Sequence, residues 1–77
     1  MGAERIEAVI AEALALRNLS FDREARLIAD LGMDSYDVVS LIIEIEAVLD
    51  TEFDEDTQVF FIEGSLGEIS DRLAQWA

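Results

Sequence analysis

Hydrophobic residues recur every three or four positions in two segments of the chain, as expected for helices that bury one face. In the first segment, residues 4–16, the predicted core positions are Ile6, Val9, Ile10, Ala13 and Leu14. The second segment, residues 35–49, has more apolar residues than one face can hold. Its predicted core face consists of Val38, Leu41, Ile42, Ile45, Val48 and Leu49.

The C-terminal part of the chain predicts two shorter helices. Residues 59–62 read Val-Phe-Phe-Ile, which alone is compatible with a strand, but no second strand is available to pair with it. We therefore predict a short helix near 57–63, ended by Gly64. Ser65 and Glu68 have the spacing of a capping box, and Ile69, Leu73 and Trp76 form the apolar stripe of a last helix.

These elements predict an all-α fold, a small three-to-four-helix bundle with a long first loop, in one domain that spans residues 1–77. The loop, residues 17–31, has no continuous helical stripe, although a short helical turn over 24–29 is compatible with it. We expect Leu19, Phe21 and Ile28 to hold the loop against the core. The predicted core is Ile6, Val9, Ile10, Leu14, Leu27, Leu31, Val38, Leu41, Ile42, Ile45, Leu49, Phe61, Ile69 and Leu73.

Charge and composition restrict the classes of function that the chain can have. The chain has 18 acidic residues and five basic ones, all arginine, for a net charge of −13, and residues 30–77 contain only Arg72 as a cation. The negative electrostatic field of such a chain repels nucleic acids and anionic membranes and attracts proteins with basic patches. Because there is no histidine and no cysteine, a compact Ser-His-Asp or Cys-His enzyme is excluded.

No segment resembles a signal peptide or a membrane span. The longest apolar stretch, Val38 to Ile43, is far shorter than the ~20 residues that cross a bilayer. We expect a cytoplasmic protein that acts as a monomer.

Segment 35–49 carries a second apolar strip outside its core face. It consists of Tyr36, Val39, Ile43 and Ala47, flanked by Asp37, Glu44, Glu46 and Asp50. Two interpretations remain open: a central helix buried on two sides, or a docking surface for a basic and partly apolar partner.

The start of the same segment has candidate chemistry. Asp34 or Ser35 is suited to cap the helix, and a phosphate on Ser35 would be stabilised by the free N–H groups and dipole of the helix start. Three nearby carboxylates are candidates for weak binding of a divalent cation that neutralises such a phosphate: Asp30, Asp34 and Asp37.

Residues 30–39, Asp-Leu-Gly-Met-Asp-Ser-Tyr-Asp-Val-Val, resemble the attachment motif of acyl carrier proteins, whose core is Leu-Gly-x-Asp-Ser before an acidic helix. The length of the chain, its acidity and its long first loop also match that family. The resemblance implies that Ser35, next to the motif residue Asp34, carries 4′-phosphopantetheine donated by coenzyme A through a phosphopantetheinyl transferase. The imported thiol would let a chain without cysteine carry acyl groups as thioesters, as a carrier and not as an enzyme.

The resemblance also implies partners: acyl-activating enzymes, acyltransferases or synthases with basic docking patches, in fatty-acid, polyketide or another specialised acyl pathway. The candidate partner contacts are the strip residues Tyr36, Val39 and Ile43 and the flanking acids Asp37, Glu44 and Glu46. Tyr36 stands where the family usually has leucine, and Ser40 where fatty-acid carriers often have glutamate. These departures favour a dedicated pathway at least as much as housekeeping fatty-acid synthesis.

Three other functions fit the sequence less well. A peptidyl or aminoacyl carrier of a nonribosomal peptide pathway is the nearest alternative, although its motif more often reads Gly-Gly-x-Ser. A non-covalent acidic binding module fits the charge but does not require the Leu-Gly-Met-Asp-Ser motif. A calcium-binding EF-hand is disfavoured, because the acidic stretch after Asp50 lacks glycine throughout residues 51–59.

Overall fold

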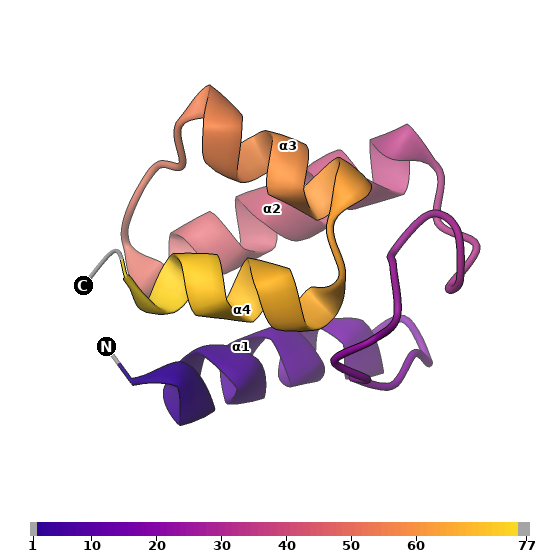
Figure 1. The fold of residues 1–77 in the computed structure, drawn as a ribbon, viewed down its shortest axis with the longest axis horizontal. Coiled ribbons are helices and arrows are strands. Elements are labelled where there is room, and N and C mark those ends of the chain that lie inside the picture. The colour runs from indigo at the N-terminus through magenta and orange to yellow at the C-terminus, as the bar shows by residue number, and fades with distance from the viewer. Residues whose placement is uncertain (1, 76–77) are drawn as a thin grey trace.

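Four helices, joined by one long loop and two short connections, make up the computed structural model, which describes residues 2–75. The helices are α1 (Ala3–Ala15), α2 (Ser35–Leu49), α3 (Glu55–Glu63) and α4 (Leu66–Ala74). In Figure 1, α4 lies between α1 and α3, and α2 runs behind them. Helices α1 and α3 each pack against both α2 and α4. The predicted all-α bundle is confirmed, with the third helix starting two residues earlier than predicted.

All four helices contribute to one hydrophobic core. Eleven of the fourteen predicted core residues are buried, and Val9, Leu31 and Leu49 pack against the core only partly buried. The structure adds buried residues that lie outside the predicted stripes: Ala25, Met33, Phe53 and Leu66. Trp76 lies outside the described residues.

Two predicted contacts with the core are wrong. Val48 is 61% exposed and Ile28 37% exposed. Val48 lines an open groove along the contact between α1 and α2, and no described side chain covers it. Ile28 lies in a surface turn, where its backbone position and not its hydrophobicity decides how far it is exposed.

The long first loop holds no helix over residues 24–29. The chain instead makes two turns: the Ala25 amide donates to the carbonyl oxygen of Asp22 at 3.0 Å, and the amides of Asp30 and Leu31 both donate to that of Arg26, at 3.0 and 3.1 Å. The loop is joined to the start of α4, because the Leu66 amide donates to the carbonyl oxygen of Ala25 at 2.8 Å and the Gly67 amide to that of Arg23 at 2.9 Å. A Cβ at Gly67 would stand 3.0 Å from the Arg23 carbonyl oxygen, so a larger residue there would have to push the loop back by a few tenths of an ångström.

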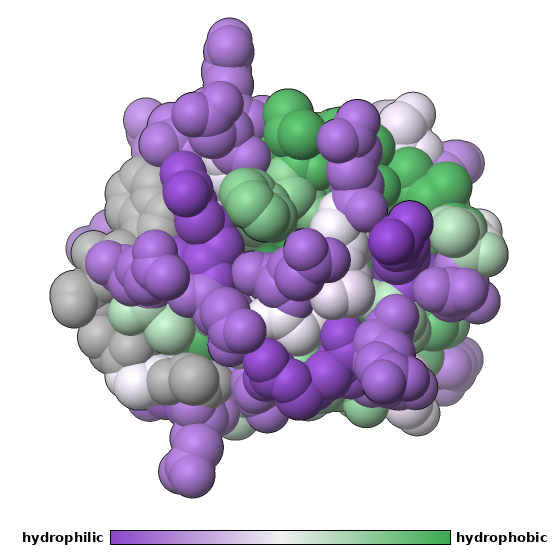
Figure 2. All heavy atoms as spheres, viewed as in Figure 1, coloured by the Kyte–Doolittle hydropathy of each residue, from purple (hydrophilic) through white to green (hydrophobic). Residues whose placement is uncertain are grey.

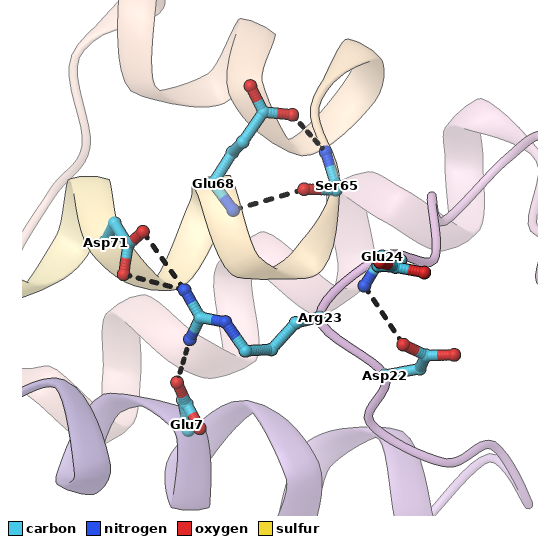
Figure 3. A network of polar contacts seen from close by, with 7 residues as sticks. All are labelled: Glu7, Asp22, Arg23, Glu24, Ser65, Glu68 and Asp71. Carbon is cyan, nitrogen blue, oxygen red and sulfur yellow. Dashed lines mark hydrogen bonds and ion pairs between the residues drawn. The ribbon is translucent and has the colours of Figure 1, made fainter.

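Arg23 attaches the loop to two helices at once (Figure 3). Its guanidinium donates to the Glu7 carboxylate of α1. It also donates to both carboxylate oxygens of Asp71 in α4, at 3.0 Å from each oxygen. The hydrogen bond and charge of Asp71, with help from Glu7, raise the pKa of Arg23. The middle of the loop that leads to α2 is therefore fixed to both α1 and α4.

Side-chain caps begin the last two helices. The carboxylate of Asp54 accepts from the Thr57 amide at 2.8 Å at the start of α3. At the start of α4, the Glu68 carboxylate accepts from the Ser65 amide at 2.9 Å, and the Ser65 hydroxyl accepts from the Glu68 amide at 3.2 Å, which confirms the predicted capping box. Hydrogen bonds from Thr57 lower the pKa of Asp54, and those with Ser65 lower the pKa of Glu68.

These lowered pKa values predict how stability depends on pH. A carboxyl group with a lower pKa when folded stabilises the protein above its unfolded pKa, and this stability is lost as pH falls through the folded pKa. We expect the melting temperature to fall as pH is lowered from about 5 to about 3. Asp54→Asn keeps a good capping residue but cannot titrate, so its melting temperature should fall less.

The matched control for this measurement is Asp56→Asn, which removes the same charge from the first turn of α3 but leaves the Asp54 cap in place. Thermal melts followed by circular dichroism at pH 7, 5, 4 and 3 test the prediction. An Asp54→Asn variant that loses as much stability in acid as Asp56→Asn would contradict it.

Candidate functional site

Ser35 is the first residue of α2 and is exposed to solvent. The helix is capped by the residue before it: the Asp34 carboxylate accepts from the Asp37 amide at 2.8 Å, and the Asp37 carboxylate accepts from the Asp34 amide at 3.5 Å. Of the two capping residues that the sequence left open, the structure selects Asp34. The Ser35 hydroxyl is therefore not engaged in capping and forms no hydrogen bond within residues 2–75.

The loop before Ser35 fixes the position of this helix start. Gly32 has φ +74°, in the left-handed region that favours glycine. Met33 is buried, and its amide donates to the carbonyl oxygen of Leu27 at 3.0 Å. With Met33 anchored and Asp34 capping, Ser35 is the first side chain of the helix that is free at the surface.

The helix start fits a phosphodiester on Ser35. The amides of Ser35 and Tyr36, the first two of α2, have no partner among the described residues, and the helix dipole favours negative charge at this end. A phosphate attached to the serine oxygen would lie next to these donors. Asp34 and Asp37 are also negative, but both carboxylates are held by hydrogen bonds to backbone amides in the capping box.

The candidate divalent-cation ligands are not gathered into a site. Across residues 2–75, no group of three or more acidic side chains is arranged to hold a metal ion. The Asp30 carboxylate accepts from the Arg26 amide at 2.8 Å, within the first loop, while Asp34 and Asp37 form the capping box.

The apolar strip of α2 is at the surface, which rules out the interpretation that α2 is buried on two sides. Tyr36 is 78% exposed, Val39 50% and Ile43 59%, and Asp37 beside them is exposed as well. Helix α3 adds the exposed side chains of Val59 and Ile62. Figure 2 shows hydrophobic surface over α3 and the first turns of α2 at the top and right of the view.

Two of the candidate partner contacts are engaged inside the protein. The Glu44 carboxylate pairs with Arg17 at 2.5 Å, and Arg17 also donates to the carbonyl oxygen of Ala13 at 2.9 Å, which links α1 to α2. The Glu46 carboxylate accepts from the Phe53 amide at 2.7 Å and holds the connection to α3. Helical spacing cannot indicate these partners, because they come from other segments.

A membrane-spanning helix is not found among the described residues, since none of their helices is both long enough and apolar enough to cross a bilayer.

Comparison with known proteins identifies the family. The phosphopantetheine attachment site family matches residues 4–73. The chain belongs to the acyl carrier protein family. It is 40% identical over 53 residues to the acyl carrier protein of Amoebophilus asiaticus (strain 5a2), a match that covers 69% of this chain and 66% of that protein. It is 35% identical over 66 residues to the acyl carrier protein of Clostridium perfringens (strain SM101 / Type A), covering 84% and 87%.

Membership in the acyl carrier protein family identifies the cofactor as phosphopantetheine, which supplies a thiol when bound. The matched range includes the exposed Ser35, the Asp34–Asp37 capping box and the apolar strip of α2. The chain is thus a carrier by family, and its four-helix fold agrees with that assignment.

Proposed function

We propose that this protein carries acyl groups as thioesters on a 4′-phosphopantetheine arm attached to the Ser35 side chain. The observation that carries the proposal is the position of Ser35: an exposed first helical residue whose hydroxyl is free because Asp34 makes the cap. We propose that a phosphopantetheinyl transferase installs the arm.

The attachment step is a phosphoryl transfer. The Ser35 Oγ attacks the phosphorus that bears the pantetheine group in coenzyme A. A new O–P bond forms while the phosphoanhydride bond to the nucleotide breaks, so adenosine 3′,5′-bisphosphate leaves. The serine proton passes to a base of the transferase, because the nearby carboxylates of Asp34 and Asp37 are held by backbone amides in the capping box. The contribution of this protein is a fixed helix start whose free amides and dipole stabilise the attached phosphate.

Delivery of the acyl group depends on recognition by partner enzymes. We propose that the transferase and the acyl-loading or acyl-transferring enzymes dock on Tyr36, Val39 and Ile43, with Asp37 at the edge. The net charge of −13 favours partners with basic patches and accelerates their encounter. Delivery of a thioester-bound acyl group to a partner enzyme is compatible with fatty-acid synthesis, polyketide synthesis or another specialised acyl pathway.

Intact-mass spectrometry tests the attachment. The apo-protein, incubated with coenzyme A and a broad-specificity phosphopantetheinyl transferase, should gain the mass of one phosphopantetheine group. Peptide mapping should locate the added mass on Ser35. A chain that never gains this mass, while a known carrier treated in parallel is fully converted, would refute the proposed function. Incubating the modified protein with acyl-activating and aminoacyl-activating enzymes then distinguishes the pathways.

The docking strip makes a separate prediction. Val39→Asp and Ile43→Asp should each slow modification by the transferase about tenfold or more, because a carboxylate without a partner is costly to bury in an apolar contact. Their free energy of unfolding should change by less than about 1 kcal/mol, since both side chains are half or more exposed. Initial rates and urea denaturation measure the two effects.

The matched control for the strip is Ala8→Asp, which adds a carboxylate at an exposed position of α1. It should be modified within about twofold of the wild-type rate, because a surface substitution away from the contact changes little. A loss of about 3 kcal/mol or more in Val39→Asp or Ile43→Asp would place these residues in the core and contradict the docking role.

A further inference from the structure

A groove of about 480 Å³ lies between α1 and α2 and adjoins the apolar strip of α2, with which it shares Ala47. Val48 follows Ile43 by five residues, which places it about 140° further around the helix. The groove is also distant from the attachment site, because Ser35 and Val48 are separated by about 20 Å along α2. Its lining consists of Val9, Glu12, Ala13, Leu16, Glu44, Ile45, Ala47 and Val48.

Large hydrophobic side chains stand open to solvent on both walls of this groove. Leu16 of the α1 wall is 75% exposed and Val48 of the α2 wall is 61% exposed. Single exposed hydrophobic residues are common, but two that face one groove from different helices form a contiguous apolar surface. Since none of the described segments covers it, the groove is available to another molecule.

Negative charge borders the apolar lining. Glu12 in the groove forms no ion pair within residues 2–75, whereas the charge of Glu44 is compensated by Arg17 at 2.5 Å. A second, acidic hollow adjoins the groove and shares Ala47 with it; its other lining residues are Glu46, Asp50, Thr51 and Glu52. Asp50 and Glu52 are exposed and, like Glu12, unpaired within the described residues. The groove therefore combines an apolar floor with uncompensated carboxylates at its edges.

We propose that this groove is a second docking site, which binds an amphipathic helix of a partner protein that has arginine or lysine on both sides of its apolar face. An amphipathic helix laid between two helices inserts apolar side chains at i, i+3, i+4 and i+7. Its cations would face Glu12 on one wall and Asp50 and Glu52 at the end of the other. A second copy of this chain is disfavoured as the occupant, because each copy has a net charge of −13.

The proposed site goes beyond the carrier function and does not require a modified Ser35. A partner held in the groove leaves the Ser35 end and the strip of Tyr36, Val39 and Ile43 uncovered. The protein would then be able to stay attached to one protein while other enzymes act at the attachment site.

The test uses the Ser35→Ala variant, so that no arm or carried group is present, labelled with ¹⁵N for amide spectra. The probe is a synthetic 18-residue helical peptide, acetylated and amidated, with leucines on one face and arginines flanking them. We expect saturable shifts of the amides that line the groove in α1 and α2. Binding should weaken as salt is raised, because screening reduces the attraction between the arginines and the carboxylates.

Matched variants assign the binding to the groove. Leu16→Ser with Val48→Ser should weaken binding at least tenfold, because two apolar side chains are removed without a change in charge. Glu12→Gln should reduce the salt dependence. Val59→Ser, an equally simple change on α3, should have no effect, since α3 makes no contact with α1. Circular dichroism confirms that each variant is folded.

Four results would overturn the proposal. The first is the absence of saturable binding up to about 1 mM peptide, and the second is equal binding of a peptide with glutamates in place of the arginines. The third is a set of amide shifts confined to the strip of Tyr36, Val39 and Ile43. The fourth is self-association of the free protein through the groove in sedimentation runs. Because the Ser35→Ala background carries no arm, these results are independent of whether the proposed carrier function holds.

Discussion

Replacing Ser35 with alanine is expected to abolish covalent modification completely while leaving the protein folded. The hydroxyl is the nucleophile in the proposed attachment, and alanine has none. The structural cost should be below about 0.5 kcal/mol, because Asp34 makes the cap and alanine is a good residue for the first turn of a helix. Intact mass after incubation with coenzyme A and a transferase measures the first effect, and urea denaturation the second.

The other serines are less suited to attachment. Ser65 uses its hydroxyl in the capping box of α4, Ser70 is fully buried, and Ser40 is partly buried inside α2. Ser20 is exposed but lies in the first loop, away from any helix start, so Ser20→Ala is the matched control and should be modified like the wild type. A Ser35→Ala variant that still gains one phosphopantetheine would show that another residue is the attachment point.

The helices were predictable because their hydrophobic period is local to each segment. The Ser65–Glu68 capping box was found from its spacing alone, and the structure has it. At the start of α2, spacing was insufficient, because aspartate and serine are equally good caps. In the structure, the Asp37 amide donates to the Asp34 carboxylate, so Asp34 is the cap and the Ser35 hydroxyl is not used for capping.

The exposure of the second strip was not predictable from its pattern. Tyr36, Val39 and Ile43 have the period of a buried face, and only the positions of the other helices show that the described residues leave them half or more exposed. The same limit explains Val48: its angle on α2 fits the core face, but the groove between α1 and α2 leaves it exposed. Periodicity gives the direction of a side chain from the helix axis and not the neighbour it meets.

Contacts between distant segments were also out of reach. Arg23 meets Glu7 and Asp71 only because the first loop crosses α1 and α4, and Glu46 caps the Phe53 amide only because the chain turns back after α2. Nothing in the local sequence marks these pairs. Phe53 itself was missed as a core residue, since it lies in a polar connection and not on a helical stripe.

Phe61 carries the second large expected effect, because Phe61→Ala should remove a large part of the free energy of unfolding of the domain. Its side chain is fully buried, and its ring stacks on Phe53 with centroids 5.7 Å apart and an angle of 21°. Replacing a buried phenylalanine with alanine costs about 3–5 kcal/mol. A domain of this size has a total stability of roughly 4–12 kcal/mol, so the substitution should remove between about a quarter and all of it.

The matched control is Phe60→Ala, the same substitution at the preceding position of α3. Phe60 is only half-buried, and the Arg72 guanidinium lies 5.4 Å from its ring centroid, a contact worth about 0.5–1 kcal/mol at an exposed site. Its loss of stability in urea denaturation should therefore be clearly smaller, and equal losses would contradict the packing described for α3. Modification of Ser35 should follow the folded fraction of Phe61→Ala, because the capped start of α2 exists only in the folded chain.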